Sequence, residues 1–306
     1  MSHDYEQLAA RYLEAWARVR NEDQFAQGLS ELKQLAVRER QPDAAMRLAV
    51  MYRQGQGVPQ CDAHVRLWLN IALQLKHPFA APFELFCDRS YRNAAAQWRR
   101  LDQQWQCVPP VWSTAHALGD VAVAPPKKVG RHRYRHRRRR ALLPALPRAS
   151  VSARGGWRLE IWYYLGVITK WRSLPAAVEW FSKAARVGHA ASHYRMHEHK
   201  CNEALSALHL NQAAQQGFLA AYITLGCSYW RADSWDQCAF WFKRAALRGS
   251  WSAYSSLASL LRCLDDCTKP RNEALSLELQ RRSLYLQNQA EAGAHDFLHS
   301  MGLVTD

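Results

Sequence analysis

The stretch that decides the fold is 48–69, LAVMYRQGQGVPQCDAHVRLWL. Its pattern predicts one helix, a glycine-rich turn and a second helix. Gly55 and Gly57 can adopt φ > 0, so either can end a helix at little cost. Pro59 fixes φ and lacks an amide hydrogen, which keeps the first helix from continuing. The stretch therefore predicts a helical hairpin.

The second half of such a hairpin recurs downstream. The phrase Trp-Phe-x-x-Ala-Ala-x-x-Gly ends at Gly188 and again at Gly249, and a shorter copy ends at Gly217. These glycines recur about every 30 residues, each where a helix would end. Repeats of this length are typical of arrays of helical hairpins, in which each hairpin buries its apolar face against its neighbours.

A second phrase of small and apolar residues marks the first helix of each hairpin. Its copies are Ala44/Leu48/Ala49, Ala221/Leu225/Gly226 and Ala253/Leu257/Ala258, with a weaker Ile161/Leu165/Gly166. Positions i, i+4 and i+5 lie close together on one helix face, where small residues let a neighbouring helix approach. We therefore expect the Ala221 copy, together with Trp241 and Ala245, to face neighbouring helices.

Together the two phrases resemble the Sel-one-like repeat, a branch of the tetratricopeptide-like helical repeats. The resemblance covers about 43–75 and 159–293, and the copy at 44–72 carries the whole glycine turn. It implies an all-α, right-handed α-solenoid of helix-turn-helix repeats. It also implies a protein-protein interaction scaffold or adaptor that binds a partner protein or peptide. Ordinary helical hairpins with convergent Ala and Trp spacing are the alternative interpretation.

The pattern divides the chain into three parts. Residues 1–106 hold two amphipathic helices within 4–40, the first repeat and further helix over 83–105. Residues 157–306 hold the C-terminal repeats and a capping helix. The eight cysteines stand singly, which is typical of reduced thiols and favours a cytoplasmic location. No run of about 18 apolar residues predicts a membrane span.

Residues 107–156 separate these parts and differ from them in composition. They hold six prolines and eleven Lys or Arg against one acid, and so carry +10 of the formal net charge of +15. Such a composition predicts a disordered basic linker. An Arg-, Ala- and Pro-rich sequence of this kind is also typical of a scrambled or frame-shifted segment, and that alternative stays open.

The basic linker suggests a second function, polyanion binding. Basic side chains that neutralise phosphates release counterions, so nucleic acid or an acidic membrane are the candidate partners. The candidate residues are Lys127, Lys128, Arg131, Arg133, Arg135, Arg137, Arg138, Arg139 and Arg140. A solvated linker with incidental affinity is the simpler interpretation.

A histidine cluster suggests a third function, a metal-dependent enzyme centred on His193 and His197. Histidines four residues apart on a helix can chelate zinc, and His199 and Cys201 are further candidate ligands. However, Gly188 is expected to end the preceding helix, which would place His189 before the next one. Partly exposed histidines on a degenerate repeat are the alternative. Cys263-x-x-x-Cys267 is by itself weak evidence for a metal site or a disulfide.

No pattern singles out a catalytic residue or a cofactor. Gly55-x-Gly57 lacks the preceding strand and the following Lys-Ser/Thr of a phosphate loop, so it is interpreted as a turn. The sequence therefore predicts binding without enzymatic activity or cofactor. It does not name the partner or the oligomeric state.

Overall fold

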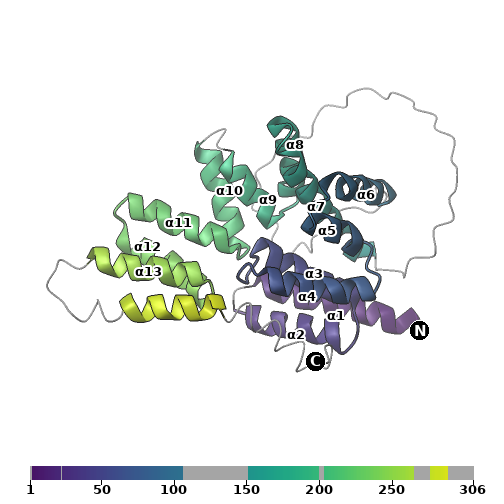
Figure 1. The fold of residues 1–306 in the computed structure, drawn as a ribbon, viewed down its shortest axis with the longest axis horizontal. Helices are drawn as coiled ribbons and strands as arrows, with labels where there is room; N and C mark the ends of the chain where they lie inside the picture. The colour runs from purple at the N-terminus through teal and green to yellow at the C-terminus, as the bar shows by residue number, and fades with distance from the viewer. Residues whose placement is uncertain (1, 22, 106–150, 200–202, 265–275, 289–306) are drawn as a thin grey trace.

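The computed structural model describes residues 2–21, 23–105, 151–199, 203–264 and 276–288, and within these ranges the chain is helical (Figure 1). The helices are α1 Ser2–Arg20, α2 Phe25–Val37, α3 Pro42–Gln54, α4 Asp62–Gln74, α5 Ala80–Cys87, α6 Tyr91–Gln104, α7 Val151–Thr169, α8 Leu174–Ala185, α9 Ala190–Glu198, α10 Glu203–Gln215, α11 Leu219–Arg231, α12 Trp235–Leu247 and α13 Trp251–Leu264. A last helix spans 276–288. The predicted all-α class is confirmed for these ranges, and no helix in them is long and apolar enough to cross a membrane.

Consecutive helices pack against each other as hairpins, as Figure 1 shows for α3 with α4, α7 with α8 and α11 with α12. The hairpins share a continuous core of buried side chains that reaches from Tyr12 to Ala253. Each hairpin thus buries its apolar face against its neighbours. The predicted α-solenoid of helix-turn-helix repeats is confirmed.

The small residues of the repeat let the two helices of a hairpin approach closely. A Cβ added at Gly226 on α11 would lie 2.4 Å from Phe242 Cε1 on α12. A Cβ added at Gly166 on α7 would lie 2.6 Å from Phe181 Cε1 on α8. The same contact therefore recurs in two repeats. Ala221 and Ala245 are buried as well, so the expected orientation of this face is confirmed.

The repeat glycines end their helices in the left-handed conformation that the sequence predicts. Gly188, Gly217 and Gly249 have φ of 90°, 76° and 79°. After each glycine, the next amide donates back to the last turn of the helix, for example from Phe218 N to Ala213 O at 3.1 Å. This is the hydrogen bond of a Schellman cap, which glycine favours. Gly55 also caps α3 with φ of 74°.

The turn between α3 and α4 and the start of α2 each contact a turn far along the chain. Gly57 N donates to Gly217 O at 3.0 Å, and Leu219 N donates to Gly55 O at 3.2 Å. The guanidinium of Arg248, which follows α12, lies 4.5 Å from the centroid of the Phe25 ring. The array therefore curves until its first repeat touches the turns of later repeats.

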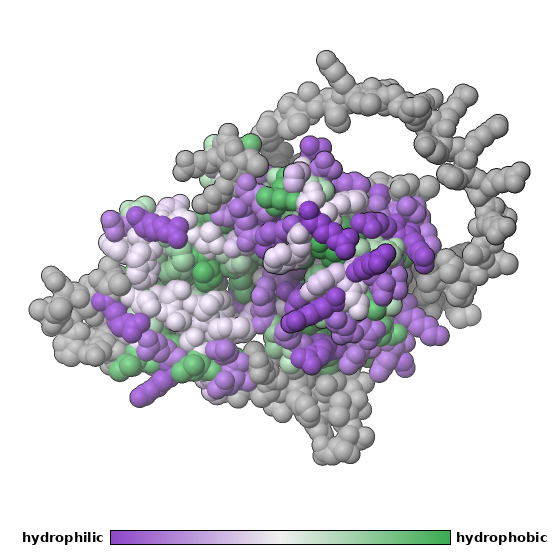
Figure 2. Space-filling model, turned by 45° about the horizontal axis from the view of Figure 1, so that its top comes forward, coloured by the Kyte–Doolittle hydropathy of each residue, from purple (hydrophilic) through white to green (hydrophobic). Residues whose placement is uncertain are grey.

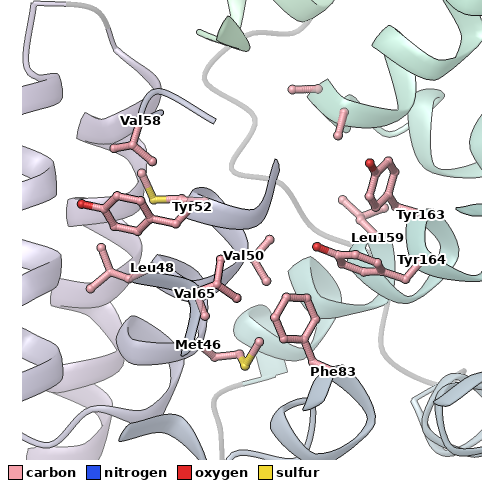
Figure 3. Close-up of a cluster of buried hydrophobic side chains, with 14 of the residues drawn as sticks. Met46, Leu48, Val50, Tyr52, Val58, Val65, Phe83, Leu159, Tyr163 and Tyr164 are labelled. Atoms are coloured by element: carbon pink, nitrogen blue, oxygen red, sulfur yellow. The ribbon is translucent and has the colours of Figure 1, made fainter. Parts of the chain in front are cut away.

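Helices before and after the 106–150 segment also share the core. Figure 3 shows Met46 and Val50 of α3, Phe83 of α5 and Tyr164 of α7 converging in one buried cluster. The ring centroids of Phe83 and Tyr164 are 5.3 Å apart in an edge-on arrangement. The N-terminal repeat and the C-terminal repeats are thus joined by packing as well as by the chain.

Two boundaries differ from those expected. The helix expected over 83–105 is two helices, because Arg89 has φ of 62° and ends α5. The basic linker was expected to extend to 156, but α7 begins at Val151. Residues 106–150, which hold the rest of the predicted linker, lie outside the described residues.

Candidate functional site

A buried ion pair holds α3 against α7. Arg47 Nη1 lies 2.7 Å from Glu160 Oε1, and both side chains are almost completely buried. Gln54 Nε2 donates to Glu160 Oε2 at 2.6 Å, and His189 Nε2 lies 3.3 Å from that oxygen. Burial alone would raise the pKa of Glu160, but His189, Arg47 and Gln54 stabilise the carboxylate and lower its pKa to about 2.

The remaining polar groups of this region also engage one another. Trp157 Nε1 donates to Asp43 Oδ1 at 2.7 Å, and His77 Nε2 lies 3.2 Å from the same oxygen. The guanidinium of Arg47 lies between two indole rings, 4.4 Å from Trp16 and 4.3 Å from Trp157. Since these groups are enclosed and mutually paired, the network joins helices rather than forming an accessible active site.

A second polar contact fixes α6 against α7. Asp102, near the end of α6, is buried and accepts from Arg158 Nε at 3.1 Å and from Trp162 Nε1 at 3.0 Å. Both donors lie near the middle of α7. The end of α6 thus lies beside the middle of α7. The two helices run antiparallel, because Trp98, earlier in α6, stacks on Tyr164, later in α7. This pairing leaves the start of α6 beside the end of α7.

An open pocket of about 650 Å³ lies where α6 begins and α7 ends. Its walls combine five arginines with two aromatic side chains and three smaller residues. The lining residues are Arg53, Arg89, Tyr91, Arg92, Ala95, Arg99, Ile168, Thr169, Trp171 and Arg172. Its volume falls within the roughly 300–1,000 Å³ of ordinary ligand pockets. This is the candidate functional site, and we call it the arginine pocket.

Two helices and two turns supply these arginines. Arg92 and Arg99 occupy positions i and i+7 of α6, with the buried Ala95 between them, so they lie on one helix face. Arg53 comes from the last turn of α3, Arg89 from the turn before α6 and Arg172 from the turn after α7. A basic rim therefore surrounds the pocket.

The pocket also exposes aromatic surface. Trp171 is 85% exposed and Tyr91 is 40% exposed, whereas most tryptophans of the hairpins are buried or half-buried. Figure 2 shows long hydrophilic side chains crowded on the right-hand half of the face that it draws, which holds the N-terminal helices. Arginine with tryptophan and tyrosine is the composition enriched at protein interfaces.

The histidines of the predicted metal cluster point to different partners. His189 is the N-cap of α9, as the sequence indicated, and its Nδ1 accepts from Ser192 N. His193 Nδ1 lies 2.8 Å from His209 Nδ1, and His197 Nδ1 lies 2.8 Å from Ser206 Oγ. His199 stacks on Phe181 with ring centroids 6.0 Å apart.

Burial, assisted by the positive charge that His209 and His189 would carry, lowers the pKa of His193 to about 3. Within the described ranges, no group of three or more His, Cys, Asp or Glu side chains is arranged to hold a metal ion. Cys201 and Cys267 lie outside those ranges, as does the side chain of Cys263. The metal-site hypothesis therefore stays a prediction without support from the described geometry.

None of the predicted polyanion-binding residues belongs to the described ranges. Lys127, Lys128, Arg131, Arg133, Arg135, Arg137, Arg138, Arg139 and Arg140 all fall within 106–150. The sequence analysis missed the arginine pocket. One signal for it was present, the Arg92-x-x-Ala95-x-x-x-Arg99 spacing on a helix that also carries the buried Trp98.

Fold and site together define a helical-repeat protein with a basic surface pocket. No family model and no curated protein matches the chain. The chain is similar to the solved structure of a protective antigen of uropathogenic Escherichia coli strains that displays an SLR fold, with 15% identity. That match covers 90% of this chain and 68% of the other, with a TM-score of 0.38.

A second solved structure is similar, that of a Sel1 repeat protein from Oxalobacter formigenes. Here the identity is 16%, the match covers 97% of this chain and 87% of the other, and the TM-score is 0.39. Since both TM-scores are below 0.5, the fold assignment rests on the helices and turns of this chain.

Proposed function

We propose that this chain is a protein-interaction scaffold that binds a partner protein on its helical-repeat surface, without catalytic turnover. The observation that carries the proposal is the arginine pocket, which is open and combines basic with aromatic side chains. Such a surface can bind a partner by charge and by stacking. By contrast, the enclosed Arg47–Glu160 pair joins helices of the array.

A cytoplasmic location is part of the proposal. Cys87, Cys227 and Cys238 are thiols that form no disulfide, which suits a reducing compartment. Burial raises the pKa of Cys87 and that of Cys238 to about 11, so these two thiols are poor nucleophiles at neutral pH. These cysteines therefore support packing rather than redox chemistry.

The proposal is tested by affinity purification on the full chain. Each recovered protein is then purified and titrated against the full chain and against a chain that lacks residues 107–156. We expect saturable binding to both forms. If only nucleic acid or acidic vesicles bind, and only to the form that retains 107–156, polyanion binding is the better description and the scaffold proposal is wrong.

The proposed absence of catalytic turnover is tested by measuring the zinc content of the protein and the effect of replacing two histidines. Dialysed protein should carry well under one zinc ion per chain, and His193→Ala combined with His197→Ala should leave partner binding unchanged. One equivalent of tightly held metal, lost in that double variant together with a hydrolytic rate, would establish the metal-dependent enzyme instead.

A further inference from the structure

We infer that the arginine pocket binds an acidic segment of the partner protein, a short stretch with several carboxylates beside an aromatic or aliphatic residue. This inference rests on the proposed scaffold function and names the chemistry of its ligand. The argument comes from the charge of the pocket, its aromatic walls, its rigidity and its extent.

Four of the five pocket arginines have no carboxylate partner among the described residues. Arg53 Nη1 lies 3.0 Å from Asp62 Oδ1 and is thus partly neutralised. Among the described residues, no carboxylate lies within 4.0 Å of Arg89, Arg92, Arg99 or Arg172. Each of these guanidinium groups presents a planar fork of donors that matches a carboxylate. The pocket can therefore accept more than one carboxylate at once.

The aromatic walls select for an apolar residue among the acids. Trp171, Tyr91 and Ile168 line the same pocket as the arginines. An exposed indole loses little side-chain entropy when it is covered, and its burial removes apolar area from water. A ligand made only of charges would leave the indole in water. A segment with an aromatic or aliphatic side chain would cover it.

The arginine-bearing elements are held in place before any ligand arrives. The contacts of Asp102 with Arg158 and Trp162 fix α6 on α7. Trp98, three residues after Ala95 on α6, is fully buried and stacks on Tyr164 with ring centroids 5.2 Å apart. The pocket also lies at the start of α6, where Ser90, the N-cap, makes no side-chain cap hydrogen bond. The positive end of the α6 dipole therefore adds partial positive charge where an anion would lie.

The extent of the site favours a peptide over nucleic acid. Single-stranded nucleic acid is bound along a basic groove that follows several nucleotides of backbone. Here the arginines gather in one pocket of about 650 Å³, a volume suited to a few side chains. A partner with a short acidic segment fits that shape, and a longer polyanion would extend beyond it.

The test is fluorescence anisotropy with the full chain and the labelled peptide Gly-Glu-Asp-Phe-Glu-Asp-Leu-Gly. The same peptide with Gln and Asn in place of the acids is the ligand control, and oligothymidylate is the competitor. We expect the acidic peptide to bind at least about tenfold more tightly than its neutral form, with an affinity that falls as salt rises.

Two pairs of protein variants locate the binding. Arg92→Glu with Arg99→Glu reverses two pocket charges, and Arg66→Glu with Lys243→Glu makes the same change in net charge on exposed residues of α4 and α12. The pocket pair should weaken peptide binding at least about tenfold, while the distant pair should change it less than about twofold. Equal effects of the two pairs would show general electrostatic attraction and overturn the inference.

A second pair guards against loss of binding through unfolding. Arg89 and Lys76 both have left-handed φ, 62° and 56°, and only Arg89 lines the pocket. Glycine is favoured at such φ, so Arg89→Gly and Lys76→Gly should each raise the melting temperature. Only Arg89→Gly should weaken peptide binding. Unchanged binding by Arg89→Gly and by the Arg92/Arg99 double variant would overturn the inference.

The outcomes separate this inference from the scaffold proposal. If purified partners still bind the Arg92→Glu/Arg99→Glu chain with full affinity, the acidic-segment inference is wrong and the scaffold proposal stands. If no purified protein binds the full chain saturably, the scaffold proposal is wrong. If oligothymidylate displaces the peptide and binds more tightly, the pocket is a nucleic-acid site, which also overturns the inference.

Discussion

Gly226→Ala is the most direct test of the repeat packing. Its added Cβ would lie 2.4 Å from Cε1, 2.6 Å from Cδ1 and 3.0 Å from Cζ of Phe242. Phe242 is 1% exposed and packs in a cluster with Cys238 and Leu260, so its ring cannot move aside freely. The matched control is Gly156→Ala in α7, where the added Cβ would lie 3.8 Å from Arg47 Nη2, an ordinary contact.

Two opposing effects set the change in unfolding free energy that each substitution causes. Alanine in place of glycine inside a helix stabilises by about 0.8–1.0 kcal/mol. Overpacking of a buried site costs about 1–3 kcal/mol. Gly156→Ala shows only the first effect and should stabilise the protein by about 1 kcal/mol. Gly226→Ala combines the gain from alanine in a helix with the cost of overpacking. The unfolding free energy of this variant should therefore lie about 1–3 kcal/mol below that of the control variant.

The assay is urea unfolding followed by far-UV circular dichroism, with thermal melting as a second measurement. In a protein of this size, 1 kcal/mol corresponds to a shift of about 2–4 °C in melting temperature. Gly166→Ala should behave like Gly226→Ala, because its Cβ would meet Phe181 in the same way. If Gly226→Ala proves as stable as Gly156→Ala, the α11–α12 contact is not as close as described, and the reasoning is refuted.

Three further predictions concern buried charge, pH and the two parts of the chain. Arg47→Met strands the buried Glu160 carboxylate and should cost about 3–5 kcal/mol in urea unfolding, while added Glu160→Gln should restore part of that loss; no restoration would contradict it. Because the pKa of His193 is lowered from 6.5 to about 3, its contribution to stability is full above pH 6.5 and is lost as pH falls towards 3. His193→Phe should therefore lose less stability than wild type in melting curves across that range, and parallel curves would refute this. Trypsin should cleave first within 131–140, which the sequence predicts to be accessible, and the two pieces should co-elute from a sizing column because α6 packs on α7; separate elution would contradict that packing.

Local signals were enough to predict the hairpins. Gly188 could be interpreted as a helix end because a glycine follows an apolar helical face, and it has φ of 90°. Gly226 could be interpreted as a contact position because small residues recur there, and it meets Phe242. Both predictions need only the chemistry of a few neighbouring residues, so they can be made without knowledge of the tertiary structure.

Contacts between distant residues could not be predicted in that way. Arg47 and Glu160 are 113 positions apart, and nothing near either one indicates the other. The arginine pocket joins side chains from α3, α6 and the end of α7, so its positive charge exists only after the helices stack. The basic run at 131–140 drew attention because it is contiguous, whereas the pocket arginines are scattered along the sequence.

The hydrogen bond between Gly57 and Gly217 has a consequence for how the protein unfolds. In an open array each repeat touches only its neighbours, so stability is a sum of local contributions and the ends fray independently. Here the second hairpin is bonded to a turn 160 positions away along the chain. Loosening the C-terminal repeats should remove support from α3 and α4 as well. Unfolding should then be one cooperative transition, and hydrogen exchange should report similar protection at both ends.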